Sequence, residues 1–117
     1  MNTLKNSVSL IGNLGMDPEI TNFESGTSLA RFRVATNDSY KDKKGEWQTR
    51  TEWHNIVAWG KSAELCAKLL KKGSEVVLEG KLENDSYTDK EGVKKYKTEI
   101  KLREFVLVNR NKENSNQ

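Results

Sequence analysis

Residues 51–61 read Thr-Glu-Trp-His-Asn-Ile-Val-Ala-Trp-Gly-Lys, and this stretch decides the fold. Aromatic and β-branched residues predict a long strand over residues 47–59, and Gly60 ends it before a helix. Because side chains alternate along a strand, one face of it carries Trp53, Asn55, Val57 and Trp59. The other, inward face carries His54, Ile56 and Ala58. Two tryptophans opposite a smaller apolar face predict an external stacking partner, with core or subunit packing as the alternative.

Further strands are expected on both sides of this stretch. Alternating apolar residues predict strands over residues 7–14 (with a glycine bend), 29–36, 75–83 and 96–108, and a short edge strand over 19–23. The strand at 29–36 has a basic outer side made by Arg31 and Arg33. Residues 42–45 and 89–92 are polar hairpin tips, and residues 37–39 are expected to disturb the register before the first tip.

One helix is predicted, over residues 61–70. Its apolar stripe is formed by Leu65, Leu69 and Leu70, with Ser62 helping to start the helix and Gly73 capping its end.

The order of three long strands, one helix and two more strands predicts an all-β fold. We expect a five-stranded OB-fold barrel with one short helix between strands 3 and 4. A split or open β-sheet is the alternative. The barrel is expected to occupy residues 1–108 and a short polar tail residues 109–117, with no internal repeat.

Composition excludes several classes of protein. A chain of 117 residues is long enough for one domain, and it has neither an apolar membrane span nor a signal peptide, so we expect it to be cytoplasmic. Cys66 is the single cysteine, so neither a disulfide nor a structural zinc site is expected, and no cofactor or metal. Residues 60–62 fail as a phosphate-binding loop because Asn55 stands where that motif needs glycine. No arrangement around His54, the only histidine, suggests catalysis, so we do not expect an enzyme.

Aromatic residues interleaved with lysines favour a nucleic-acid partner. Tyr87 shares strand parity with charged residues and is expected to face solvent, provided no bulge intervenes. Tyr40 and Trp47 flank the first hairpin tip. Both are expected to be exposed, and the alternative is that they form an ordinary cross-strand pair with each other. The net charge of +3 permits a polyanionic partner.

Four motifs, at residues 12–19, 35–40, 51–61 and 72–76, together resemble the bacterial single-stranded DNA-binding protein family. The resemblance runs in order to about Val108. It implies an OB fold, a homotetramer without catalysis, and sequence-independent binding and protection of single-stranded DNA in replication, recombination and repair at the nucleoid.

The resemblance also assigns residues. Its base-stacking positions fall on Tyr40, Trp53, Trp59 and Tyr87. Its phosphate-contacting positions fall on Lys41, Lys43, Lys61, Lys71, Lys72 and Lys95. His54 matches a subunit contact, whereas a DNA-binding role for Trp47 rests on exposure alone.

Two features depart from the family pattern. Residues 82–86 are acidic where relatives are often basic, and residues 109–117 lack the acidic tip that recruits replication and repair proteins, by truncation or true absence. An RNA-binding OB module and a primosomal-type OB protein that binds other proteins are the alternative functions.

Overall fold

The computed structural model describes residues 5–108, which form a β-barrel with two projecting hairpins. Its elements are β1 (Val8–Leu14), β2 (Glu19–Asn22), β3 (Ser28–Lys41), β4 (Trp47–Trp59), α1 (Lys61–Leu69), β5 (Glu75–Thr88) and β6 (Lys94–Leu107). No helix in this part of the chain is long and apolar enough to cross a membrane.

The sheet closes on itself. Its strand order is β1-β5-β6-β4-β3-β2, and β1 also pairs with β3 through Asn13–Ala35 and Leu14–Val34. Strand β2 is a short addition at the edge of β3, so α1 follows the third of the five barrel strands. The predicted five-stranded OB barrel is confirmed, and the open-sheet alternative is wrong.

A glycine permits this closure. A Cβ on Gly12 would lie 2.1 Å from the backbone oxygen of Ala35, so β1 can approach β3 only where a side chain is absent. The glycine bend expected in the first strand therefore lies at the seam of the barrel.

The core is aliphatic, with one phenylalanine and one cysteine. Its fully buried side chains include Val34, Ile56, Cys66, Val76 and Leu78.

Helix α1 covers one end of the barrel with a different stripe from the one predicted. Ala63, Cys66 and Leu70 are buried, whereas Leu65 and Leu69 are exposed. Small residues lie on the buried face because the helix packs closely on β3 and β4.

The predicted helix ends also differ. Gly60, not Ser62, is the N-cap, and Leu70, not Gly73, is the C-cap. Gly73 instead has a φ of 92° in the turn that follows, a conformation that favours glycine.

Burial determines the chemistry of Cys66. It raises the pKa of the thiol from 9.0 to about 11, and the thiolate is the reactive form. A thiol reagent at about pH 8 should therefore modify Cys66 only after unfolding. Since the unfolded chain ionises first, stability should fall as pH rises from about 9 towards 11. Rapid modification of the folded protein would contradict this burial.

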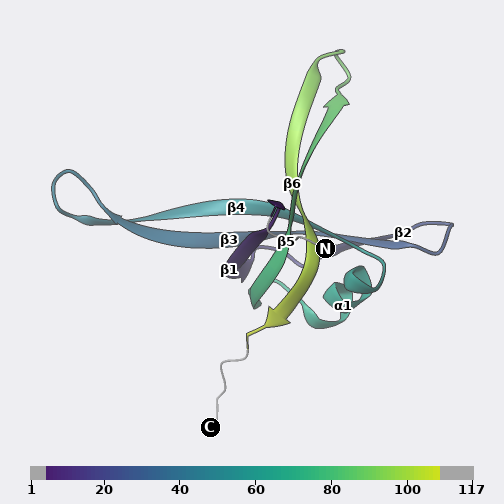
Figure 1. Cartoon of the computed structure of the whole chain (residues 1–117), viewed down its shortest axis with the longest axis horizontal. Helices are drawn as coiled ribbons and strands as arrows, with labels where there is room; N and C mark the ends of the chain where they lie inside the picture. The colour runs from purple at the N-terminus through teal and green to yellow at the C-terminus, as the bar shows by residue number, and fades with distance from the viewer. Residues whose placement is uncertain (1–4, 109–117) are drawn as a thin grey trace, which may run out of the picture.

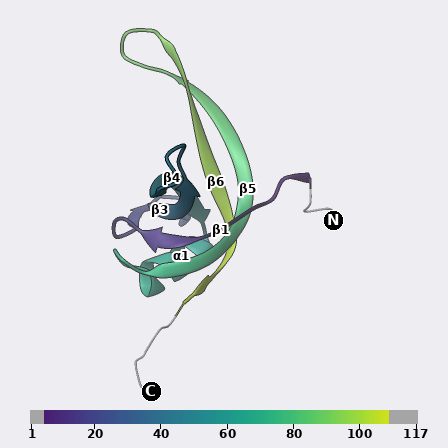
Figure 2. The same ribbon diagram turned by 90° about the vertical axis from the view of Figure 1, so that its left-hand side faces the viewer.

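Two hairpins extend beyond the barrel and diverge (Figures 1 and 2). We call residues 37–52, from β3 and β4, the first arm, and residues 84–99, from β5 and β6, the second arm. In Figure 1 the first arm runs sideways and the second rises from the barrel. The predicted register disturbance at residues 37–39 is wrong, because β3 pairs with β4 without interruption to Lys41–Trp47. The Thr51 hydroxyl donates to Asn37 Oδ1 at 2.7 Å, so these polar side chains pair across the arm.

Candidate nucleic-acid interface

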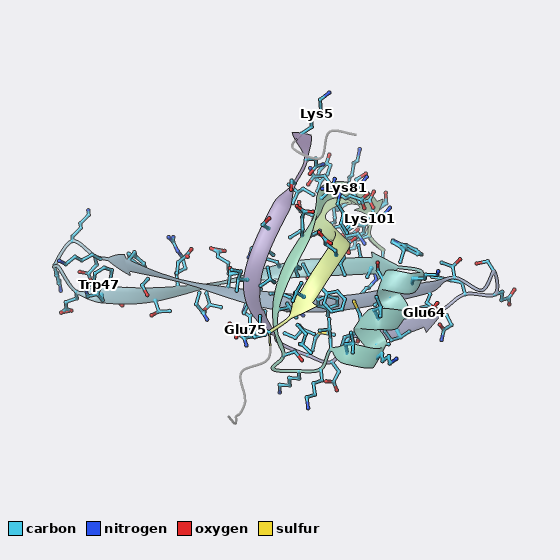
Figure 3. The ribbon with its side chains drawn as sticks, turned by 60° about the horizontal axis from the view of Figure 1, so that its bottom comes forward. Lys5, Trp47, Glu64, Glu75, Lys81 and Lys101 are labelled. Atoms are coloured by element: carbon cyan, nitrogen blue, oxygen red, sulfur yellow. The ribbon has the colours of Figure 1, made fainter. Side chains whose placement is uncertain are left out.

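Three tryptophans lie on the outer face of β4. The register places Trp47, Trp53 and Trp59 on one side of the β3–β4 ribbon, opposite the buried Ile56 and Ala58. The exposed fractions are 70% for Trp47, 54% for Trp53 and 43% for Trp59. Each is six residues from the next, which is about 20 Å along a strand. Figure 3 shows Trp47 near the far end of the first arm. The outer face therefore presents a row of indole rings to solvent.

Trp53 rests on a glycine. A Cβ on Gly15 would lie 2.4 Å from Trp53 Cζ3, so the ring packs directly against the chain after β1. Gly15, Met16, Arg33 and Trp53 line an open hollow of about 320 Å³. The ring is thus fixed on one side and open on the other, which suits it to receive a base.

Trp59 is supported by a second aromatic ring. Phe23 stacks against it with ring centroids 6.0 Å apart and an angle of 19° between the planes. No sequence pattern indicates this contact, which depends on the β2–β3 hairpin. The outward position predicted for Val57 holds by register, but its side chain is only 4% exposed.

The charge on this face is mainly basic. Arg31 Nη1 lies 2.6 Å from Glu99 Oε2, and Glu99 is also 3.8 Å from the ammonium of Lys97. Arg31 and Glu99 line a second hollow of about 240 Å³ together with Glu19, Arg33 and Asn55. Arg33 lines both hollows and has an exposed side chain, so it is placed to contact a phosphate.

Tyr87 lies on the outer side of the second arm, opposite Lys95, and is 50% exposed. A bulge is present, but β6 carries its extra residue: pairing passes from Glu79–Glu104 to Gly80–Leu102. Alternation along β5 is therefore intact, and the predicted exposure of Tyr87 is confirmed.

Tyr40 lies on the opposite side of the first arm from the tryptophans. It pairs with Gln48, whereas Trp47 pairs with Lys41, so Tyr40 and Trp47 are not a cross-strand pair. The Tyr40 ring is 44% exposed and has the Arg50 guanidinium 5.2 Å from its centroid. The four predicted stacking residues are thus all exposed, but they do not share one surface.

The predicted phosphate-binding lysines are all exposed but spread over three regions. Lys41 and Lys43 lie at the first arm, Lys61, Lys71 and Lys72 near the ends of α1, and Lys95 on the second arm. A single strand would have to pass several of these regions to meet them all.

His54 is half-buried and hydrogen-bonded within the chain. Its Nε2 lies 2.9 Å from the Thr36 hydroxyl. A role in subunit contact stays a prediction.

The model of the Single-strand binding protein family matches residues 5–108. The chain belongs to this family. Single-stranded DNA-binding protein 1 of Chlorobaculum tepidum is 53% identical over 104 residues, which are 88% of this chain and 64% of that protein. The protein of the same name from Xylella fastidiosa is 43% identical over 111 residues, 94% of this chain and 82% of the relative. This chain thus spans slightly less than two thirds of the Chlorobaculum relative.

Solved structures of single-stranded DNA-binding proteins share the fold. The Plasmodium falciparum SSB complex with ssDNA matches with a TM-score of 0.83 and 30% identity, over 89% of this chain and 95% of that one. A deletion mutant of the Thermus aquaticus protein matches with a TM-score of 0.77 and 27% identity, over 88% of this chain and 50% of that one.

This member of the single-strand binding protein family also has an exposed aliphatic row on its barrel. Ile11, Val77 and Val106 are neighbours across β1, β5 and β6, with exposed fractions of 64%, 39% and 66%. Exposed aliphatic side chains that lie side by side on the outer face of a barrel are typical of a surface that binds another protein.

Proposed function

We propose that this chain binds and protects single-stranded DNA without sequence preference, in replication, recombination and repair. The exposed row of Trp47, Trp53 and Trp59 carries this proposal, because every unpaired base has a face that can stack on an indole ring. Family membership and the fold shared with an SSB–ssDNA complex support it.

Stacking is expected to dominate the affinity. Each stacked base contributes about 1–3 kcal/mol, so a few rings outweigh the pull of a net charge of only +3. The arginines and lysines contact the phosphates and add a salt-dependent contribution to the binding free energy. Duplex DNA should bind poorly because its bases already stack on one another. Glu83 and Asp85, around the start of the second arm, are expected to weaken phosphate attraction beside Tyr87.

Competition between nucleic acids tests this function. A labelled dT oligonucleotide should be displaced by unlabelled single strands but poorly by a duplex of equal length, as followed by fluorescence anisotropy. Equal competition by duplex would contradict the proposal. Stronger competition by RNA of the same length would favour the RNA-binding alternative. The primosomal alternative requires buried aromatics, which the exposed tryptophans oppose.

We also propose that the chain assembles as a homotetramer in which the row Ile11–Val77–Val106 is covered by another copy. Burying such a row removes apolar surface from water, at about 25 cal/mol per Å². The family relationship supports this assembly.

Val77→Lys should dissociate the tetramer into smaller, folded species, because burying a charged ammonium in an apolar interface is costly. Light scattering after size exclusion gives the mass, with Val93→Lys beside the tip of the second arm as the charge-matched control. A Val77→Lys protein that keeps the mass of the tetramer would contradict the interface, and a monomeric wild type would contradict the assembly.

Recruitment of replication and repair proteins stays a prediction. The tail at residues 109–117, on which the missing acidic tip falls, lies outside the described residues 5–108.

A further inference from the structure

The two arms are copies of one ribbon, so the prediction that the chain has no internal repeat is wrong. Each residue of the first arm has a counterpart 47 positions later, and nine of the sixteen pairs are identical. Both arms begin Asn-Asp-Ser-Tyr and end Thr-Glu. The repeat is easy to miss because substitutions interrupt it after the glycine of each tip.

Both copies make the same hydrogen bonds. Thr98 donates to Asn84 Oδ1 at 2.7 Å, as Thr51 does to Asn37 in the first arm. At each tip, one aspartate oxygen accepts two backbone N–H groups at 2.9 Å: Asp42 from Lys44 and Glu46, Asp89 from Glu91 and Val93. The bond from the Glu46 N–H is the main cause that lowers the pKa of Asp42 below 3.8.

The two arms join the barrel in opposite orientations. We call the side of each arm that continues the buried face of the barrel its inner side, and the other its outer side. In the first arm, Tyr40 lies on the same side as the buried Phe32 and Val34. In the second arm its counterpart Tyr87 lies on the outer side, with Lys81 and Glu83. The repeated tyrosine is therefore on the inner side of one arm and on the outer side of the other.

Tyr96 provides an aromatic ring on the inner side of the second arm. It pairs with Ser86 and lies on the same side of β6 as the buried Ile100. Its side chain is 74% exposed, and the ammonium of Lys94 lies 5.6 Å from its ring centroid. Each inner side thus carries a tyrosine with a cation beside it, Tyr40 with Arg50 and Tyr96 with Lys94.

The bases of the two arms meet at the barrel, in a region that we call the fork. A hollow of about 160 Å³ lies there, lined by Trp53, His54, Asn55, Leu82, Thr98 and Ile100. Both views show the arms diverging from this region (Figures 1 and 2). The fork connects Trp53 on β4 with the inner side of the second arm, so one strand could pass from one to the other.

We propose that Tyr96 and Lys94 form an additional nucleotide-binding site, in which a base stacks on the tyrosine ring and its phosphate contacts the ammonium. The bound strand passes through the fork and reaches this site from Trp53. This inference rests on the proposed function and adds Tyr96 and Lys94, which were not among the predicted site residues, to the DNA-binding surface.

Tyr96→Ala should weaken binding of a dT oligonucleotide about 5- to 10-fold, the lower end of the range for one stacked base. Tyr96→Phe should bind as wild type, because stacking does not need the hydroxyl. Lys94→Ala should reduce the slope of log affinity against log salt by about 0.7, the value for one phosphate contact to a single strand. Val93→Ala, which shortens another exposed side chain of the same arm, is the control.

Photo-crosslinking gives an independent readout. An oligonucleotide carrying 5-iododeoxyuridine should crosslink to the peptide that contains Tyr96, as identified by mass spectrometry. If wild type binds the oligonucleotide, but Tyr96→Ala binds equally well and no crosslink forms there, the site is wrong and the proposed function stands. If wild type does not bind at all, both are wrong.

Discussion

Replacing Trp53 and Trp59 together by alanine is expected to weaken binding of single-stranded DNA by about 30-fold or more. Two lost stacking contacts of at least about 1 kcal/mol each correspond to that factor. The fold should survive, because both rings are partly exposed and the loss should be smaller than the roughly 3–5 kcal/mol for a buried tryptophan. Titration with a dT oligonucleotide gives the affinity, and thermal melting gives the stability.

Leu65→Ala is a suitable control for this double variant. It removes an exposed apolar side chain from α1 and should leave DNA affinity unchanged. If the tryptophan variant loses its cooperative melting transition, the two rings are needed for the fold. If it binds DNA like wild type, bases do not stack on Trp53 and Trp59.

Gly12→Ala is expected to have the largest effect on stability. The new Cβ would lie 2.1 Å from a backbone oxygen of β3 and 2.8 Å from Val34 Cγ1, and the backbone atom cannot rotate away. Overpacking commonly costs about 1–3 kcal/mol, and we expect at least the upper value here because the clash falls on the seam of the barrel. For a domain of this size, thermal melting should show a decrease in Tm of more than about 10 °C.

Ser9→Ala, at an exposed position of the same strand, should melt close to wild type. A Gly12→Ala protein with unchanged Tm would mean that β1 does not approach β3 closely and that the barrel is not closed there.

Local patterns in the sequence were enough to predict the barrel. Alternation around Trp53 and Ile56 assigns the two faces of β4 correctly, because one face of a barrel strand is always buried. The helix face was mispredicted because leucine suggests burial, whereas close packing on the sheet favours the smaller Ala63 and Cys66.

The arrangement of the site depends on long-range register, which a single sequence does not specify. Parity within one strand predicts the exposure of Tyr87, but it cannot tell that Tyr40 lies on the other side of its arm from Trp47. The support of Trp53 by Gly15 and of Trp59 by Phe23 joins segments far apart in the chain. Tyr96 could not be predicted as a counterpart of Tyr40, because the two residues are not equivalent in the repeat. They lie on the inner sides of their arms only because the arms join the barrel in opposite orientations.

The most direct test of the central claim is the intrinsic tryptophan fluorescence of the wild-type protein during titration with a dT oligonucleotide. If bases stack on the exposed row of Trp47, Trp53 and Trp59, the fluorescence should be quenched in a saturable way, and substantial quenching should persist as salt screens the phosphate contacts. Binding that leaves the tryptophan fluorescence unchanged would contradict the account, because it would show that the strand is held by charge alone.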